Sequence, residues 1–280
     1  MPTTRPAPTA STASTPTAAT TTASTPTAST TTASTTTAAP EHRRQLDLPG
    51  QTHVAEGPHD HTGMYVMHHA FRRDLVAFAA AVRATPLTAD DTWRALADRW
   101  HRFATTLHHH HSAEDEHYWP VLLEAVEARG TATDLAEVHA MSEEHADIDP
   151  LVTACAGGFA ALVDHPCEPH RNALDVRLTG LREVLGEHLR HEETVVLPLV
   201  QRVMTTEEFD RVEKAVARAY PLREVPFIVG WAMHGLPEEG RAAMFTGAGA
   251  PYRVLHALVR RRFERAEALA FRHGDRGTRP

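Results

Sequence analysis

The chain has 280 residues and a formal net charge of −8 at pH 7 without a basic stripe, which argues against nucleic acid as a partner. It contains no run of about 18 apolar residues, so we expect neither a membrane-spanning helix nor a membrane partner. The two cysteines, Cys155 and Cys167, form no CxxC motif and predict neither a disulfide framework nor a thiolate metal site, so a reducing cytoplasm is the expected location.

The N-terminal tract has a composition that does not support a packed core. Apart from Met1 and Arg5, its first 40 residues are all Thr, Ala, Ser or Pro. Such a tract has too little apolar surface to offset the entropy lost on ordering, so we predict a disordered tail over residues 1–50. The remainder divides into a helical domain over residues 51–204 and an extension over residues 205–280.

Strand signals are nearly absent, whereas segments with helical periodicity recur between prolines and glycines, and this pattern predicts an all-α protein. The first such segment begins near residues 60–62 and ends before Pro86. Its apolar stripe comprises Met64, Met67, Phe71, Leu75, Phe78 and Val82. Of the adjacent His68 and His69, only His68 falls on this stripe, so His68 is expected to face the core.

The second predicted helix begins near residue 90 and bends or ends at Pro120. Its apolar stripe comprises Leu96, Trp100, Phe103 and Leu107. The next two positions of the stripe are His110 and Glu114, one turn apart. The same spacing recurs one step round the helix in His111 and Asp115, which are either an alternative pair or residues that support the ligands. An imidazole and a carboxylate that face a core are costly to bury unless something binds them.

The third and fourth predicted helices repeat this arrangement. His145 lies on the apolar stripe of the third helix. In the fourth helix the stripe continues into His188 and Glu192, again at the i, i+4 spacing, before Pro198 interrupts the helix. Each of the four helices therefore turns one histidine toward the core.

This constellation predicts a metal site. Four inward histidines and two carboxylates match the way helical bundles build two-metal carboxylate centres, whereas a lone histidine would more simply be a solvated or internally bonded residue. Imidazole and carboxylate donors suit iron, zinc or manganese, and two carboxylates that can each bridge favour a pair of ions. The predicted ligands are His68, His110, Glu114, His145, His188 and Glu192.

Four segments also carry a resemblance to a known family: HHAFRRDL from His68, HHHHSAEDEHYWP, SEEHADIDPL around His145, and HLRHEETVVLPL from His188. They occur in order over roughly residues 58–204 and resemble the hemerythrin-like, or HHE, domain. The resemblance implies an antiparallel four-helix bundle around a non-haem di-iron centre, with the four histidines as terminal ligands and Glu114 and Glu192 as bridging carboxylates. Iron is then the expected metal, ahead of manganese and zinc.

Two positions differ from the oxygen-carrying hemerythrins of marine invertebrates. Those proteins have a second histidine one turn before the third-helix ligand, where this chain has Met141, and an Asp five residues after the fourth-helix histidine, where this chain has Glu192 after four. The pattern is more similar to bacterial iron-centre repair proteins and actinobacterial hemerythrin-like proteins. The resemblance therefore favours reaction with O2, peroxide or NO over reversible oxygen carriage.

Three classes of function are compatible with these motifs, and they include both binding proteins and enzymes. The first is a di-iron protein that binds and reacts with O2, H2O2 or NO. The second is an O2- or peroxide-dependent di-iron oxidase or oxygenase that acts on a small organic substrate. The third is a protein that senses iron or repairs iron centres.

The C-terminal extension is predicted to be helical as well. A helix begins at Thr206, the apolar segment PFIVGWAMHG follows, and a further helix covers about residues 251–272. We expect this extension to cover the bundle. The alternative is that Trp231, Met233 and His234 shape a pocket for a small substrate.

Overall fold

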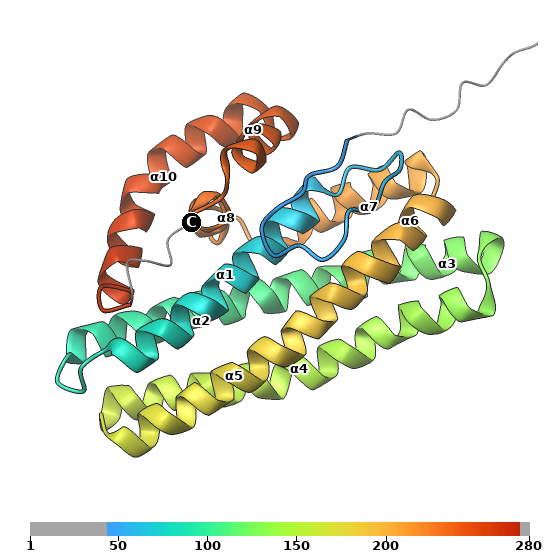
Figure 1. Ribbon diagram of the computed structural model, residues 1–280. Coiled ribbons are helices and arrows are strands. Elements are labelled where there is room, and N and C mark those ends of the chain that lie inside the picture. Colours follow the sequence, from blue (N-terminus) through green and yellow to red (C-terminus); the bar gives the residue numbers. More distant parts are fainter. Residues whose placement is uncertain (1–43, 275–280) are drawn as a thin grey trace, which may run out of the picture. The chain divides into compact units, whose positions relative to one another are not determined.

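The computed structural model describes residues 44–274, and within this range it is helical without a β-strand (Figure 1). The bundle consists of α1 (Thr62–Ala84), α2 (Asp90–Ala113), α3 (Trp119–Arg129), α4 (Ala132–Asp164), α5 (Glu168–His191) and α6 (Leu197–Val203). Two π-helical turns, η1 (Glu114–Tyr118) and η2 (Glu192–Val196), join α2 to α3 and α5 to α6 without a break. The prediction of an all-α helical bundle is confirmed.

The four rods of the bundle are α1, α2–η1–α3, α4 and α5–η2–α6 (Figure 1). Short connections such as residues 85–89 and 165–167 reverse the chain between successive rods, so neighbouring rods run antiparallel. α4 packs against α5 and α2, and α1 packs against α5. The start of α4 is defined by a capping box, in which Thr131 and Asp134 each bind the other's backbone N–H.

Buried apolar side chains form two clusters, and the predicted ligands lie between them. One cluster includes Leu107 of α2 and Ile148 of α4, and the other includes Tyr118 of η1 and Met141 of α4. Along α2–η1, His110 and Glu114 fall between Leu107 and Tyr118, and along α4, His145 falls between Met141 and Ile148. The bundle therefore contains a polar layer with apolar packing on both sides.

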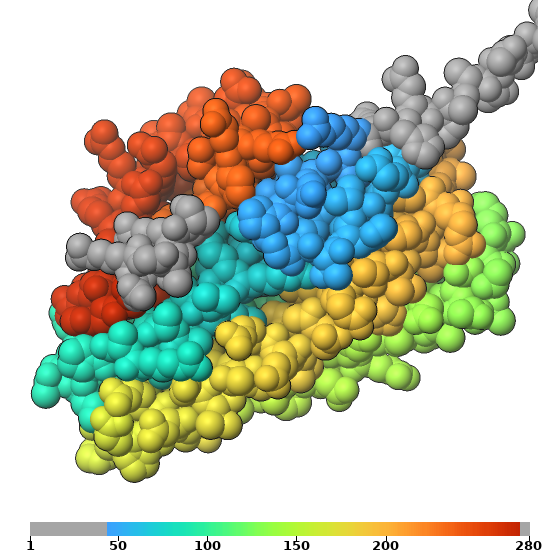
Figure 2. Space-filling view, viewed as in Figure 1, coloured from blue at the N-terminus to red at the C-terminus, as the bar shows by residue number. Residues whose placement is uncertain are grey.

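The segment before α1 is packed, and this changes one predicted boundary. Residues 1–43 lie outside the described residues, but residues 44–50 do not, and Leu46 and Leu48 are buried among core side chains. In Figure 2 this segment (blue) lies against the bundle, and the backbone N–H of His59 donates a 2.9 Å hydrogen bond to Gln201. The structure thus places residues 44–50 with the packed part of the chain, before the boundary expected at residue 51, because Leu46 and Leu48 supply the apolar surface that the preceding Thr-rich tract lacks.

One described helix, α4, is long and apolar enough to span a membrane by length and composition alone. In this structure it is a bundle helix that packs against α2 and α5. It also places His145 and the neighbouring Glu144 among the polar residues of the bundle.

The extension consists of α7 (Thr206–Ala219), α8 (Val225–Met233), α9 (Glu238–Gly247) and α10 (Gly249–Ala270). α10 packs against α2 and α8, and α9 packs against α1. Trp231 is fully buried, with its ring 5.0 Å from that of Phe71 and its Nε1–H donating to Asp74 over 2.7 Å. Trp231 and Met233 are thus core residues, as expected for a covering element.

A buried ionic network ties the extension to the bundle. Arg99 of α2 donates to Asp74 of α1 over 2.5 Å and to Glu267 of α10 over 2.8 Å. Burial alone would raise the pKa of Asp74, but the nearby Arg99 and Arg73 guanidinium groups outweigh it and lower that pKa. The carboxylate is therefore ionised and its charge is compensated inside the core.

We expect Asp74→Ala to reduce the free energy of unfolding by roughly 3–5 kcal/mol, because the variant removes one partner of a buried charge. Asp98→Ala, an exposed position of α2 next to Arg99, should change stability by less than about 0.5 kcal/mol. Urea denaturation followed by circular dichroism measures both values. Equal stability of the two variants would show that the network contributes nothing to the docking of α10.

Candidate metal centre

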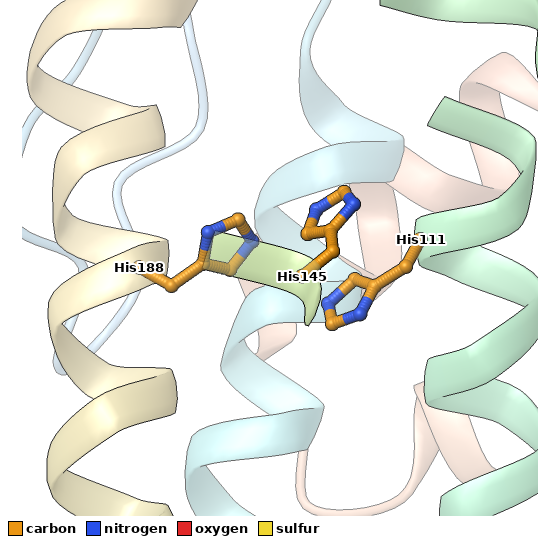
Figure 3. Close-up of side chains that lie close together, drawn as sticks. All are labelled: His111, His145 and His188. Atoms are coloured by element: carbon orange, nitrogen blue, oxygen red, sulfur yellow. The ribbon is translucent and has the colours of Figure 1, made fainter. Parts of the chain in front are cut away.

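The polar layer contains two groups of three donor residues. His68 of α1, His110 of α2 and Glu192 of η2 form one group, and all their donor atoms lie within 4.8 Å of one another. The second group consists of three histidines from three different helices, and Figure 3 shows their rings turned toward one another. Its members are His111, His145 and His188.

Glu114 lies between the two groups. Its Oε1 is 3.2 Å from Nε2 of His110, and its Oε2 is 3.5 Å from Nε2 of His145. One carboxylate oxygen thus faces each group, which is the arrangement that a bridging carboxylate requires. Oε2 of Glu192 lies 3.0 Å from Nε2 of His68.

Both carboxylates stand at the first residue of a π-helical turn. The N–H of Trp119 bonds to the carbonyl of Glu114, and the N–H of Leu197 bonds to the carbonyl of Glu192, each five residues back instead of four. A proline follows directly at residue 120 and at residue 198. Since proline has no N–H and its ring crowds the carbonyl four residues before it, a wider turn at this point relieves the clash without ending the helix. The predicted interruptions are therefore π-helical turns within continuous rods.

Within the described part of the chain, the convergent donor atoms of these residues have no hydrogen-bond partner. Each of the seven residues is at most 5% exposed. The unpartnered atoms are Nε2 of His68, His110, His111, His145 and His188, and both carboxylate oxygens of Glu114 and of Glu192. Buried polar groups without partners are costly and uncommon in folded proteins. Seven residues with convergent free donor atoms fit the requirements of bound metal ions, which satisfy them together.

Three of the histidines are held by carboxylates on their other ring nitrogen. Nδ1–H of His68 donates to Glu193 over 2.9 Å, and Nδ1–H of His188 donates to Glu144 over 2.9 Å. In the same way, Nδ1–H of His145 donates to Asp115 over 3.1 Å. A carboxylate on Nδ1 fixes the tautomer whose free Nε2 faces the centre, and it raises the basicity of the ligand.

The two Glu-containing motifs use adjacent residues for these two tasks. Glu114 faces the centre, and the next residue, Asp115, holds a histidine of α4. Glu192 faces the centre, and the next residue, Glu193, holds a histidine of α1. Glu193 is itself fixed by Arg72, which donates to it over 2.6 and 3.0 Å. The two motifs thus orient the histidines of α4 and α1, the two helices that supply no carboxylate to the layer.

Burial keeps most of the imidazoles neutral. Desolvation, reinforced by neighbouring histidines, lowers the pKa of His110 to about 3 and that of His111 well below its usual value of 6.5. Desolvation and His188 also lower the pKa of His145. Burial would lower the pKa of His68 too, but Glu192 outweighs it and raises that pKa. Neutral imidazoles are the form that binds a metal ion.

The pKa values of the two carboxylates are shifted in opposite directions. Desolvation and the charges of Glu192 and Asp115 raise the pKa of Glu114 well above its usual range. The pKa of Glu192 is lowered, because His68 beside it outweighs the effect of burial. A bound cation would stabilise both groups in their ionised form.

All six ligands predicted from the sequence lie in this layer, and the structure adds His111. His111 is 3% exposed, stacks on His145 with ring centroids 4.0 Å apart, and has no partner on either ring nitrogen. Of the two alternatives for His111 and Asp115, Asp115 takes the supporting role by binding His145, whereas His111 lies among the donors. The sequence signal for His111 is its position next to His110. Two ions require donors from more of the helix surface than a single apolar stripe provides, so the neighbour of a predicted ligand is itself a candidate.

His110→Ala and His111→Ala should each lower the metal content by about one ion per chain, because each removes a donor from a different group. His109→Ala should leave the content unchanged, because His109 belongs to neither group. Metal analysis of the purified variants measures the outcome. Retention of the full metal content in His111→Ala would restrict the centre to the six residues identified from the sequence.

Acid should weaken metal-free protein and release the metals. In the unfolded chain histidines take up protons near pH 6.5, but in the folded chain the pKa values of three histidines of the layer are lowered, so these remain unprotonated; they are His110, His111 and His145. The pKa of His68 is raised, so this residue contributes the opposite dependence of stability on pH. Stability should therefore fall as the pH falls below about 6.5, by up to about 1.4 kcal/mol per pH unit for each uncompensated proton.

Thermal melts with and without Fe(II) across pH 5 to 8 test this dependence. Metal bound only by the folded state adds about 2.7 kcal/mol when its free concentration is 100-fold above the dissociation constant. The loaded protein should melt higher at neutral pH, and the difference should close toward about pH 5 as protons displace the ions. Identical melts at neutral pH would mean that the layer holds no structural metal.

Comparison with known proteins is consistent with this geometry. The family model described as the hemerythrin HHE cation binding domain matches residues 60–200, half of the chain. No curated protein and no solved structure matches the chain. The matched range contains all seven donor residues and both π-helical turns. The chain belongs to the hemerythrin HHE cation-binding family.

Proposed function

We propose that this protein is a non-haem di-iron protein that binds and reacts with O2, peroxide or NO. The observation that carries the proposal is the buried layer of five imidazoles and two carboxylates, whose free donor atoms converge as two groups with Glu114 between them. The family supports a cation as the occupant. Iron, when bound, would supply the one-electron redox chemistry that these small ligands require.

The choice of iron rests on the donor set. All seven donors are nitrogen or oxygen atoms, with no thiolate among them. Imidazole with carboxylate suits iron, and the position of Glu114, with one oxygen toward each group, favours two ions over one. Manganese and zinc accept the same donors and are the alternatives that metal analysis distinguishes.

The surface next to the centre has the charge expected for cation binding. A groove of about 370 Å³ between α4 and α5 reaches His188, one of the seven donors. Its lining has four carboxylates against one arginine, Arg190, which pairs with Glu187; the carboxylates are Glu144, Asp147, Glu183 and Glu187. Several like charges around a concave surface raise the local concentration of the opposite ion, so this groove favours Fe(II) beside the centre.

The burial of the layer supports small ligands over an organic substrate. Its seven residues are at most 5% exposed and lie between two apolar clusters. The cavity of about 570 Å³ beneath the extension is lined by none of these residues. A diatomic molecule or a peroxide can reach a centre of this kind through small fluctuations of the packing, whereas a larger substrate would require the bundle to open.

Tyr118 is a candidate for contact with such a ligand. It follows Glu114 by one turn, is 2% exposed, and its hydroxyl has no hydrogen-bond partner among the residues that the structure describes. Burial, together with carboxylates that include Glu192 and Glu114, raises the pKa of the phenol well above its usual value. The hydroxyl therefore keeps its proton and is available as a hydrogen-bond donor inside the core.

Purified protein from iron-replete cells should contain about two iron ions per chain, because the donors supply two sites. Its optical spectrum, recorded anaerobically, should change on addition of O2, H2O2 or NO. Stoichiometric zinc without iron, or a spectrum that none of the three reagents alters, would contradict the proposal.

A matched pair of variants controls for nonspecific effects on the fold. His68→Ala should lose iron and the spectral response, since His68 is a donor with a free Nε2. His69→Ala should keep both, because the neighbouring His69 is also buried but belongs to neither group of donor residues. Loss of the response in both variants would show a general effect of substitutions in α1.

A further inference from the structure

A cavity of about 570 Å³ lies at the junction of α2, α8 and α10, away from the metal layer. Its volume falls within the range of roughly 300–1,000 Å³ that is typical of small-molecule sites. Along α2 the lining residue nearest to the layer is Arg102, eight residues before His110, or about 12 Å at 1.5 Å per residue. A molecule bound here would not touch the donors of the metal centre.

One part of the lining is apolar and open to solvent. Phe227 of α8 and Phe263 of α10 form the inner part of the apolar lining, and Phe263 is only 7% exposed. Leu258 and Leu269 of α10 also line the cavity, yet they are 74% and 43% exposed. Large apolar side chains that are exposed to solvent beside a cavity indicate a surface where burial by a ligand would be favourable.

The other part of the lining is cationic. Arg99, Arg102, Arg223 and Arg262 all line the cavity, against the carboxylates of Asp98 and Glu267. Glu267 is already paired with Arg99, and Arg102 shares Glu224 with Arg223. Within residues 44–274 no ion pair is formed by Arg262.

Arg99 adds a second, independent observation, because one nitrogen of its guanidinium remains available beside its bonds to Asp74 and Glu267. It is 5% exposed, and among residues 44–274 its Nη1 has no hydrogen-bond partner, although Nε and Nη2 are bonded. Its guanidinium carbon lies 5.4 Å from the ring centre of Phe227 and 5.9 Å from that of Phe263, the two rings that form the inner apolar lining. A buried guanidinium with one free nitrogen beside an apolar wall suits a carboxylate head group.

We infer that this cavity binds a monocarboxylate with a long apolar tail, of the fatty-acid class. The arginines hold the carboxylate, and the tail covers the phenylalanine and leucine side chains of α8 and α10. Because the cavity lies between a bundle helix and the extension, the ligand contacts both and holds them together. The inference does not depend on the chemistry of the metal layer.

The test is titration of the full-length protein with dodecanoate, kept below its micelle concentration, by isothermal calorimetry at pH 7.5. Dodecanoate should bind to one site per chain, and 1-dodecanol should bind at least about tenfold more weakly because it lacks the charge that the arginines recognise. Absence of dodecanoate binding, or equal binding of dodecyltrimethylammonium, would overturn the inference.

Matched variants locate the site. Arg262→Gln should weaken dodecanoate binding by about tenfold through loss of one charge-assisted hydrogen bond. Leu258→Asp should weaken it at least as much, since it places a carboxylate on the apolar rim. Arg265→Gln, on the same helix but outside the cavity, should bind as the unsubstituted chain does. Circular dichroism confirms the helicity of each variant, and equal weakening in Arg262→Gln and Arg265→Gln would show a nonspecific charge effect.

Discussion

The burial of seven polar side chains in one layer of a helical bundle is the constraint on which the rest of the structure depends. Five imidazoles and two carboxylates are at most 5% exposed, and their convergent atoms have no partners within the described residues. Such a layer would weaken a bundle held together by apolar packing unless ions satisfied it. Apolar clusters on both sides of the layer provide the stability that lets the bundle hold these groups in place.

The two π-helical turns allow the rods α2–η1–α3 and α5–η2–α6 to contribute residues to this layer and to continue beyond it. Each turn begins at the carboxylate that faces the centre, and the following acidic residue, Asp115 or Glu193, holds a histidine of another helix. Prolines 120 and 198 account for the wider turns, because each lacks an N–H and crowds the carbonyl four residues before it. Local backbone chemistry and the arrangement of the ligands are therefore linked in both motifs.

The extension completes the bundle and separates two kinds of site. The Asp74–Arg99–Glu267 network and the buried Trp231 fix α8 and α10 on the outer faces of α1 and α2. The same junction leaves a cavity with arginines and exposed leucines that does not reach the metal layer. A small reactive ligand in the layer and an amphiphilic ligand at the junction would thus be recognised by different chemistry, the first through metal coordination and the second through charge and apolar burial.

The sequence by itself determined the helical class and six donor residues, because apolar periodicity assigns one face to each helix and His68, His110, Glu114, His145, His188 and Glu192 continue those faces. Only the tertiary structure placed His111 in the layer and showed which carboxylates hold His68, His145 and His188. Those contacts join residues of different helices, and helical phase does not encode them. The packing of Leu46 and Leu48 and the cavity beneath α10 were likewise decided by long-range contacts, since each depends on surfaces that meet only in the folded chain.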